Sequence, residues 1–128
     1  MEKTPEENWK EMIHGLRSKC KAIVKSSPDI RYAGAINSHG RTLAGIMTEE
    51  IVPLLPVEHA RNEFFTLAML TNLREPHYND IGDMDHTILH HKRVIIILIK
   101  KDDIMFYVSV QPEADNINDI VKMIKGCI

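Results

Sequence analysis

The chain has 128 residues, 44% hydrophobic and 27% charged, a composition typical of one soluble globular domain. Sixteen basic and eighteen acidic residues give a formal charge of -2, which argues against a protein that binds nucleic acid mainly through phosphate contacts. The two cysteines form no disulfide framework, the acidic start is no secretory signal, and the longest apolar run is far shorter than the roughly 20 residues of a membrane helix. We therefore expect a cytoplasmic protein with no membrane insertion.

The first element is predicted to be a helix that ends at residues 26–29. Thr4 can cap it, Pro5 suits its first position, and Glu7 completes a capping box. Apolar residues at helical spacing predict one buried stripe. The stripe consists of Trp9, Met12, Ile13, Leu16, Cys20, Ile23 and Val24.

A β-hairpin follows, with strands at residues 30–36 and 42–47 around turn-forming residues 37–40. Gly34 and Gly45 fall inside the two strands, where glycine weakens a strand unless something packs closely on the bare backbone. A helix that crosses this face is the favoured explanation, ahead of a bound ligand.

Two prolines, Pro53 and Pro56, predict a loop or one short turn over residues 49–55. A second helix is expected from Pro56 to Arg74 and is ended by Pro76. Its apolar residues extend around more than one side, which is wider than a surface helix of a monomer needs.

Three strands and a last helix complete the chain. We expect strands at residues 86–91, 93–99 and 104–110, of which the second is a central rather than an edge strand, and a tight turn at residues 100–103. The last helix runs from residue 117 to a stop at Gly126. The most buried residues should include Ile96, Leu98, Phe106 and Val108.

These elements predict a single α+β domain over residues 1–128, in the order α-β-β-α-β-β-β-α. The five strands would form one antiparallel sheet with helices on both faces. Together with the hairpin at residues 32–45, in which a polar turn ending in Gly40 joins two small-residue strands, this order resembles the roadblock / dynein-light-chain family within the profilin-like architectures. The chain would be a divergent prokaryotic or archaeal member.

The resemblance implies a non-catalytic protein without a cofactor. Roadblock-like proteins form dimers through the central helix and the edge strand after it, and serve as scaffolds or regulators of small Ras-like GTPases. We therefore expect a homodimer, with a small GTPase or another protein as partner. Carried over to this sequence, the interface would include Phe65, Met69, Leu73, His86, Ile88 and His90.

A search for other chemistry favours the same interpretation. The sequence has neither the phosphate-loop nor the dinucleotide-binding glycine pattern. Cys20 lies on the apolar stripe of the first helix, so a buried core thiol is favoured over a nucleophile. The alternative function is a small-molecule or metal-ion sensor on a similar fold. A sensor needs an enclosed pocket, whereas this core is expected to be filled by its own aliphatic side chains.

Four histidines are weak candidates for metal ligands: His77, His86, His90 and His91. On a strand, His86 and His90 share a face but stand about 13 Å apart, so one ion cannot be bound by both without help from residues 79–85. The favoured interpretation is an edge strand whose polar side chains discourage aggregation. A third alternative is that histidines of two chains meet in a dimer.

Overall fold

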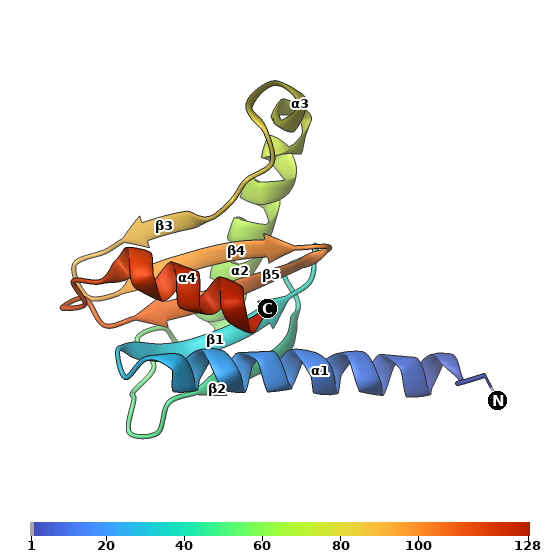
Figure 1. Ribbon diagram of the computed structural model, residues 1–128, viewed down its shortest axis with the longest axis horizontal. Coiled ribbons are helices and arrows are strands. Elements are labelled where there is room, and N and C mark those ends of the chain that lie inside the picture. The colour runs from blue at the N-terminus through green and yellow to red at the C-terminus, as the bar shows by residue number, and fades with distance from the viewer. Residues whose placement is uncertain (1) are drawn as a thin grey trace.

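The computed structural model describes residues 2–128 and contains one antiparallel sheet in the strand order β2-β1-β5-β4-β3 (Figure 1). Its strands are β1 (Ile30–Ile36), β2 (Thr42–Met47), β3 (Thr87–His90), β4 (Ile95–Lys101) and β5 (Ile104–Val110). Its helices are α1 (Pro5–Ser26), α2 (Val57–Arg74), α3 (Tyr78–Ile81) and α4 (Ile117–Cys127), with a 3₁₀ turn η1 (Glu75–His77). The predicted fold class and element order are confirmed, and η1 and α3 are short additions after Arg74.

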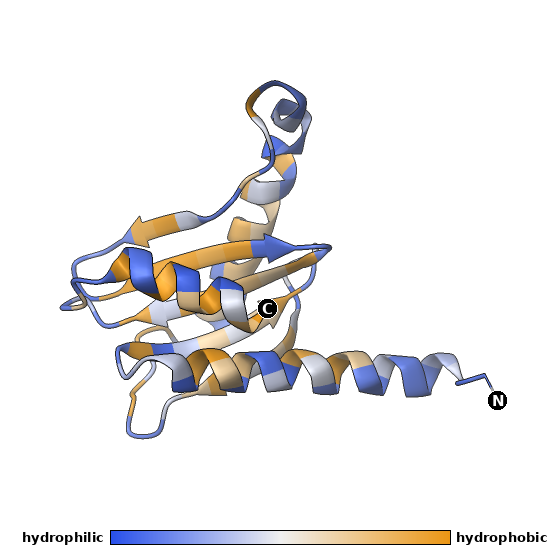
Figure 2. Ribbon diagram, in the orientation of Figure 1, coloured by the Kyte–Doolittle hydropathy of each residue, from blue (hydrophilic) through white to orange (hydrophobic). Residues whose placement is uncertain are grey.

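Helices cover both faces of the sheet. Helices α1 and α4 lie on the face toward the viewer in Figure 1, and α2 lies on the opposite face. Leu16 and Cys20 of α1 and Ile120 of α4 pack on the first face, whereas Phe64 and Leu67 of α2 pack on the second. Because both faces are covered, β4 and β5 are apolar almost throughout their length (Figure 2).

The first helix is capped as predicted. The Glu7 amide donates to the Thr4 hydroxyl at 3.1 Å, and the Thr4 amide donates to the Glu7 carboxylate at 3.3 Å. The predicted buried stripe is wrong at its beginning, because Trp9 is 53% exposed and Met12 is also exposed. The helix has 22 residues, which is about 33 Å at 1.5 Å per residue, and its first turns project past the sheet (Figure 1).

The β1–β2 turn rests against α2. Gly40 has a φ of +82°, and a Cβ at this position would lie 2.6 Å from the Cα of Phe65. Asn72 of α2 donates from Nδ2 to the backbone carbonyl of Ser38 at 2.9 Å. The turn therefore requires glycine both for its left-handed backbone and for the close approach of the helix.

The two strand glycines are covered by a side chain rather than by the expected helix. A Cβ at Gly34 would lie 2.6 Å from the Tyr32 hydroxyl oxygen, and one at Gly45 would lie 2.5 Å from it. Gly34 and Gly45 are paired across β1 and β2, so one phenol ring lies over both. The missing side chains make room for Tyr32 on the α2 face.

The last three strands match the predictions with shifted bounds. Strand β4 lies between β5 and β3 and is thus an interior strand, as predicted, whereas β3 is shorter than residues 86–91. Lys101 pairs with Ile104 inside the ladder, so the predicted turn over residues 100–103 narrows to Asp102 and Asp103, with Asp102 at a φ of 56°. The four predicted core residues are confirmed, with exposures of 1–4%.

Candidate functional site

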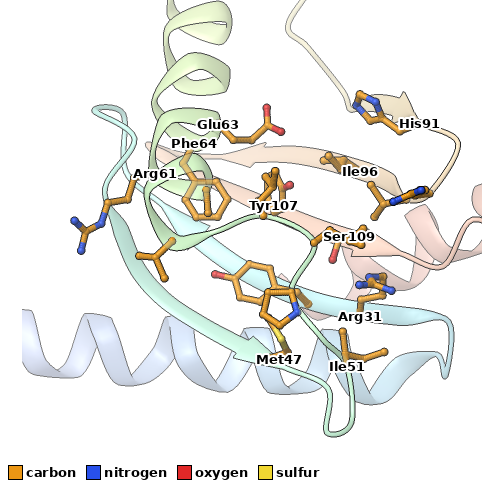
Figure 3. A pocket seen from close by; sticks show the side chains of 18 of the residues that line it. Arg31, Met47, Ile51, Arg61, Glu63, Phe64, His91, Ile96, Tyr107 and Ser109 are labelled. Atoms are coloured by element: carbon orange, nitrogen blue, oxygen red, sulfur yellow. The ribbon is translucent and has the colours of Figure 1, made fainter.

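An open apolar groove of about 660 Å³ lies on the α2 face of the sheet. The first half of α2 and the loop of residues 48–56 form its sides, and strands β1, β5 and β4 form its floor (Figure 3). Phe64 of α2 and Tyr107 of β5 both line the groove. The groove therefore exists where α2 leaves part of the sheet uncovered.

Three aromatic rings form a cluster at the floor. The ring centroids of Phe64 and Tyr107 are 4.8 Å apart in an edge-to-face arrangement. Tyr32 lies 6.5 Å from Phe64 and 6.2 Å from Tyr107. Such contacts stabilise ring orientation by roughly 0.5–1.5 kcal/mol per pair beyond burial. The floor consequently consists of aromatic rings packed against one another.

The sides of the groove are apolar side chains that remain open to solvent. Val57 at the start of α2 is 69% exposed, and Leu54, Leu55 and Met47 are also exposed. The buried cores are filled largely by aliphatic side chains, as expected, and the groove is an open surface feature beside them. Sequence reasoning treated residues 49–55 as a loop or one short turn and did not single out Leu54 or Leu55.

Arginine side chains outnumber acidic ones in the lining of the groove. Arg31, Arg61, Arg93 and His91 line it, against a single acid, Glu63. Arg31 and His91 lie on one side in Figure 3, and Arg61 lies on the other.

The phenols of the floor stay neutral at physiological pH. Burial raises the pKa of Tyr32 to about 12. Burial, and then the charge of Glu63, raise the pKa of Tyr107 above its ordinary value of 10.0. Both hydroxyls can therefore donate or accept a hydrogen bond without carrying charge.

Comparison with known proteins gives a structural answer only. The sequence matches no family model and no curated protein. The Roadblock/LC7 domain from Streptomyces avermitilis superposes with a TM-score of 0.67 at 13% identity, over 88% of this chain and 90% of that one. The gliding protein MglB from Thermus thermophilus gives 0.62 at 14% identity, over 99% and 87%. A structure described as MglB with tetrameric arrangement gives 0.56 at 12% identity, over 100% and 96%.

The chain has the roadblock fold. The resemblance drawn from the element order and the hairpin is thus confirmed for the architecture. In this roadblock fold, α2 is the helix and β3 is the edge strand on which the interface was predicted.

The helical part of the predicted interface is accessible. Phe65, Met69 and Leu73 are all exposed and follow one another at intervals of four residues along one side of α2. Phe65 lies next to the β1–β2 turn, because its backbone contacts Gly40. The opposite flank of α2 carries Leu70, which is exposed and lies two turns after the groove residue Glu63. Sequence reasoning did not single out Leu70.

The strand part of the predicted interface lies on the face of the sheet turned away from α2. Ile88 and His90 are exposed on β3, whereas Leu89 between them packs against the α2 core. His86 precedes β3, and its Nδ1 lies 2.6 Å from Asp85 Oδ2. Whether these residues contact a second chain stays a prediction.

The four candidate histidines do not converge. His77 lies in η1, His90 ends β3, and His91 belongs to the groove. His86 faces Asp85, whose Oδ2 also accepts from Lys125 Nζ of α4 at 2.5 Å. Within residues 2–128, no three His, Cys, Asp or Glu side chains come together in a way that could hold a metal ion.

The thiol of Cys20 is a core side chain, as predicted. Cys20 is buried between α1 and the sheet, and burial raises its pKa to about 11. Its thiol is therefore protonated at neutral pH and is poorly placed to act as a nucleophile.

Among the described residues, no helix combines the length and the apolar character needed to cross a bilayer.

Proposed function

We propose that this protein is a cytoplasmic, non-catalytic interaction or regulatory protein that acts as a homodimer, with a small Ras-like GTPase as its partner. The observation that carries the proposal is the roadblock fold together with exposed apolar side chains on α2 and the adjoining edge strand. Leu73 is 68% exposed, Leu70 is 45% exposed and Ile88 is 37% exposed. The tetrameric arrangement described for one MglB structure with this fold supports assembly.

The edge strand gives the dimer a simple geometry. Strand β3 is the last strand of the sheet, so one side of its backbone is free to pair with an identical strand. A two-fold axis at this edge would join two sheets and bring the two α2 helices together on one face. Burial of Leu70 and Leu73 from both chains would then contribute about 1.5–3 kcal/mol for each side chain.

Sedimentation equilibrium at micromolar concentration tests the dimer. The expected species has twice the chain mass of 14.7 kDa. Leu70→Asp combined with Leu73→Asp should shift it to monomer, because an unpaired buried carboxylate is costly. Val52→Asp is the matched control, since Val52 is 77% exposed on the 48–56 loop. A wild-type protein that sediments as a monomer would contradict the proposal.

The same measurement decides between the two sides of α2. Phe65→Asp should weaken the dimer more than Leu70→Asp if the predicted set Phe65, Met69 and Leu73 forms the contact. The reverse order would place the contact on the flank next to β3. Dimers of wild-type strength in both variants would mean that α2 is not the contact helix.

Binding to GTPases tests the partner. Small Ras-like GTPases from the source genome, loaded with GDP or with a non-hydrolysable GTP analogue, should bind in a manner that depends on the nucleotide. Titration calorimetry against the purified chain measures this preference directly. Equal or absent binding to both nucleotide states would limit the role to that of a scaffold for other proteins.

The sensor alternative is not favoured, because a small-molecule site encloses most of its ligand and this groove is open.

A further inference from the structure

We propose that the groove binds a short extended peptide segment of a protein partner, with apolar residues on the groove floor and acidic residues at its edge. This inference rests on the proposed function, because it names the chemistry of a partner for an interaction protein. It concerns a surface distinct from the dimer contact, since the groove lies at the first half of α2 and not at Leu70 and Leu73.

The apolar part of the occupant follows from the floor and sides. The packed rings of Tyr32, Phe64 and Tyr107 line the floor, and most of the apolar surface open to an occupant comes from exposed side chains such as Leu54 and Val57. Grooves lined by aromatic side chains and open along their length are a recurrent means of docking extended peptides. A peptide that covered these side chains would remove apolar area from water, at about 25 cal/mol per Å².

The acidic part follows from charge complementarity. Three arginines and His91 line the groove against Glu63 alone. Within residues 2–128, none of the three arginines forms an ion pair. A guanidinium binds a carboxylate through two parallel hydrogen bonds, so Arg61 and Arg93 at the surface are suited to the acidic side chains of a peptide. Other acids near the groove, Glu58 in α2 and Glu49 and Glu50 in the loop, do not line it.

The volume sets the length of the segment. An extended chain occupies roughly 4.8 Å by 10 Å in cross-section, so about 660 Å³ holds about 14 Å of it, or about four residues. Because successive side chains of an extended chain alternate in direction, apolar residues would face the floor and their neighbours would face the arginines. The expected motif is therefore short, with two apolar residues beside one or two acidic residues.

Selection from a random peptide library tests the inference, and it does not require the partner to be identified first. A phage-displayed library of 12-residue peptides is panned on the wild-type protein. The selected peptides should be enriched in Asp and Glu beside apolar or aromatic residues. Failure to select any peptide, or selection of peptides without acidic enrichment, would overturn the proposal.

Variants then locate the binding site. Fluorescence anisotropy with labelled selected peptides should show binding at least about tenfold weaker for the double variant Arg61→Glu/Arg93→Glu, because two attractions become repulsions. Higher salt should weaken wild-type binding. Arg17→Glu on exposed α1 is the matched control and should bind as wild type does. Val57→Asp should also weaken binding, and thermal unfolding verifies that each variant is folded.

The test of peptide binding to the groove can be distinguished from the test of the proposed dimer. Sedimentation of the same samples reports the oligomeric state independently of peptide binding. A monomer that binds acidic peptides would contradict the dimer and support the groove. A dimer whose selected peptides bind wild type and Arg61→Glu/Arg93→Glu equally would overturn the groove and leave the dimer intact.

Discussion

Arg31 donates a hydrogen bond from Nη2 to the backbone carbonyl oxygen of Val52 at 3.0 Å. This bond joins strand β1 to the loop of residues 48–56, which forms one side of the groove. The same guanidinium donates from Nη1 to Gln111 Oε1 at 3.3 Å, so it is held from both sides. The loop is further anchored where the Thr48 amide donates to the Arg31 carbonyl at 2.9 Å. The side chain of Arg31 thus helps to fix the loop that shapes the groove.

Removal of this guanidinium should loosen the loop and leave the fold intact. In Arg31→Ala, backbone amides of residues 50–55 should exchange with deuterium faster than in wild type, because the loop loses a contact to the sheet. The amides of β4 and β5 should exchange as before. Arg41→Ala, at the β1–β2 turn, is the control. Unchanged loop exchange in Arg31→Ala would show that the guanidinium does not hold the loop.

Truncation of Phe106 should destabilise the domain strongly. Phe106 is 2% exposed in the α1–α4 core, and deletion of a buried aromatic ring costs about 3–5 kcal/mol. Trp9→Ala is the matched control, because Trp9 is 53% exposed on α1 and should cost less than about 1 kcal/mol. Denaturant unfolding followed by circular dichroism measures both. Equal costs for the two variants would show that Phe106 contributes no more than a surface ring.

Two glycine-to-alanine substitutions should change the stability of the fold in opposite directions. Gly40→Ala should be destabilising, because the φ of +82° disfavours alanine and its Cβ would collide with the α2 backbone. Gly15→Ala should stabilise by up to about 1 kcal/mol, since Gly15 lies inside α1 and nothing lies within 4 Å of an added Cβ. The thermal unfolding midpoint should fall in Gly40→Ala and rise in Gly15→Ala, relative to wild type. A stabilising Gly40→Ala would contradict the tight contact between the turn and α2.

The pH dependence of stability should include a contribution from Asp85. Hydrogen bonds from Lys125 and then His86 lower the pKa of Asp85 below its ordinary value of 3.8. A carboxylate with a lowered pKa stabilises the fold above the unfolded pKa and loses this effect as the pH falls through the folded one. Asp85→Asn should therefore lower the thermal midpoint at pH 7 and have little effect near pH 2. An equal difference at both pH values would exclude the carboxylate charge as the cause.

The sequence predicts the fold well because its signals are local and repeated. The Thr4–Glu7 capping box, the hairpin turn at Gly40 and the alternation along residues 104–110 each fix one element, and short connections leave few ways to arrange them. The observed bounds of an element differ from the predicted ones where the local sequence signal is weak. Lys101 reads as a turn residue, but its backbone still pairs with Ile104 in the ladder.

The groove was not predictable in the same way. Its residues come from separate parts of the chain, and no spacing rule brings Tyr32, Phe64 and Tyr107 together. Apolar residues in a loop, such as Leu54, are also ambiguous, because they can fill a core or line a surface. The exposed Trp9 shows the converse error, since helical periodicity continues after the helix has passed the edge of the sheet.

The groove exists because one helix covers a face that is five strands wide. Five strands spaced by about 4.8 Å span about 24 Å, whereas a helix with its side chains is about 10–12 Å across. The loop of residues 48–56 closes part of the remaining width with side chains that are largely outside the two buried cores. Substitutions in this loop can therefore change what the surface recognises at little cost in folding free energy. The surface of the groove can therefore vary while the sheet and the helices beneath it stay the same.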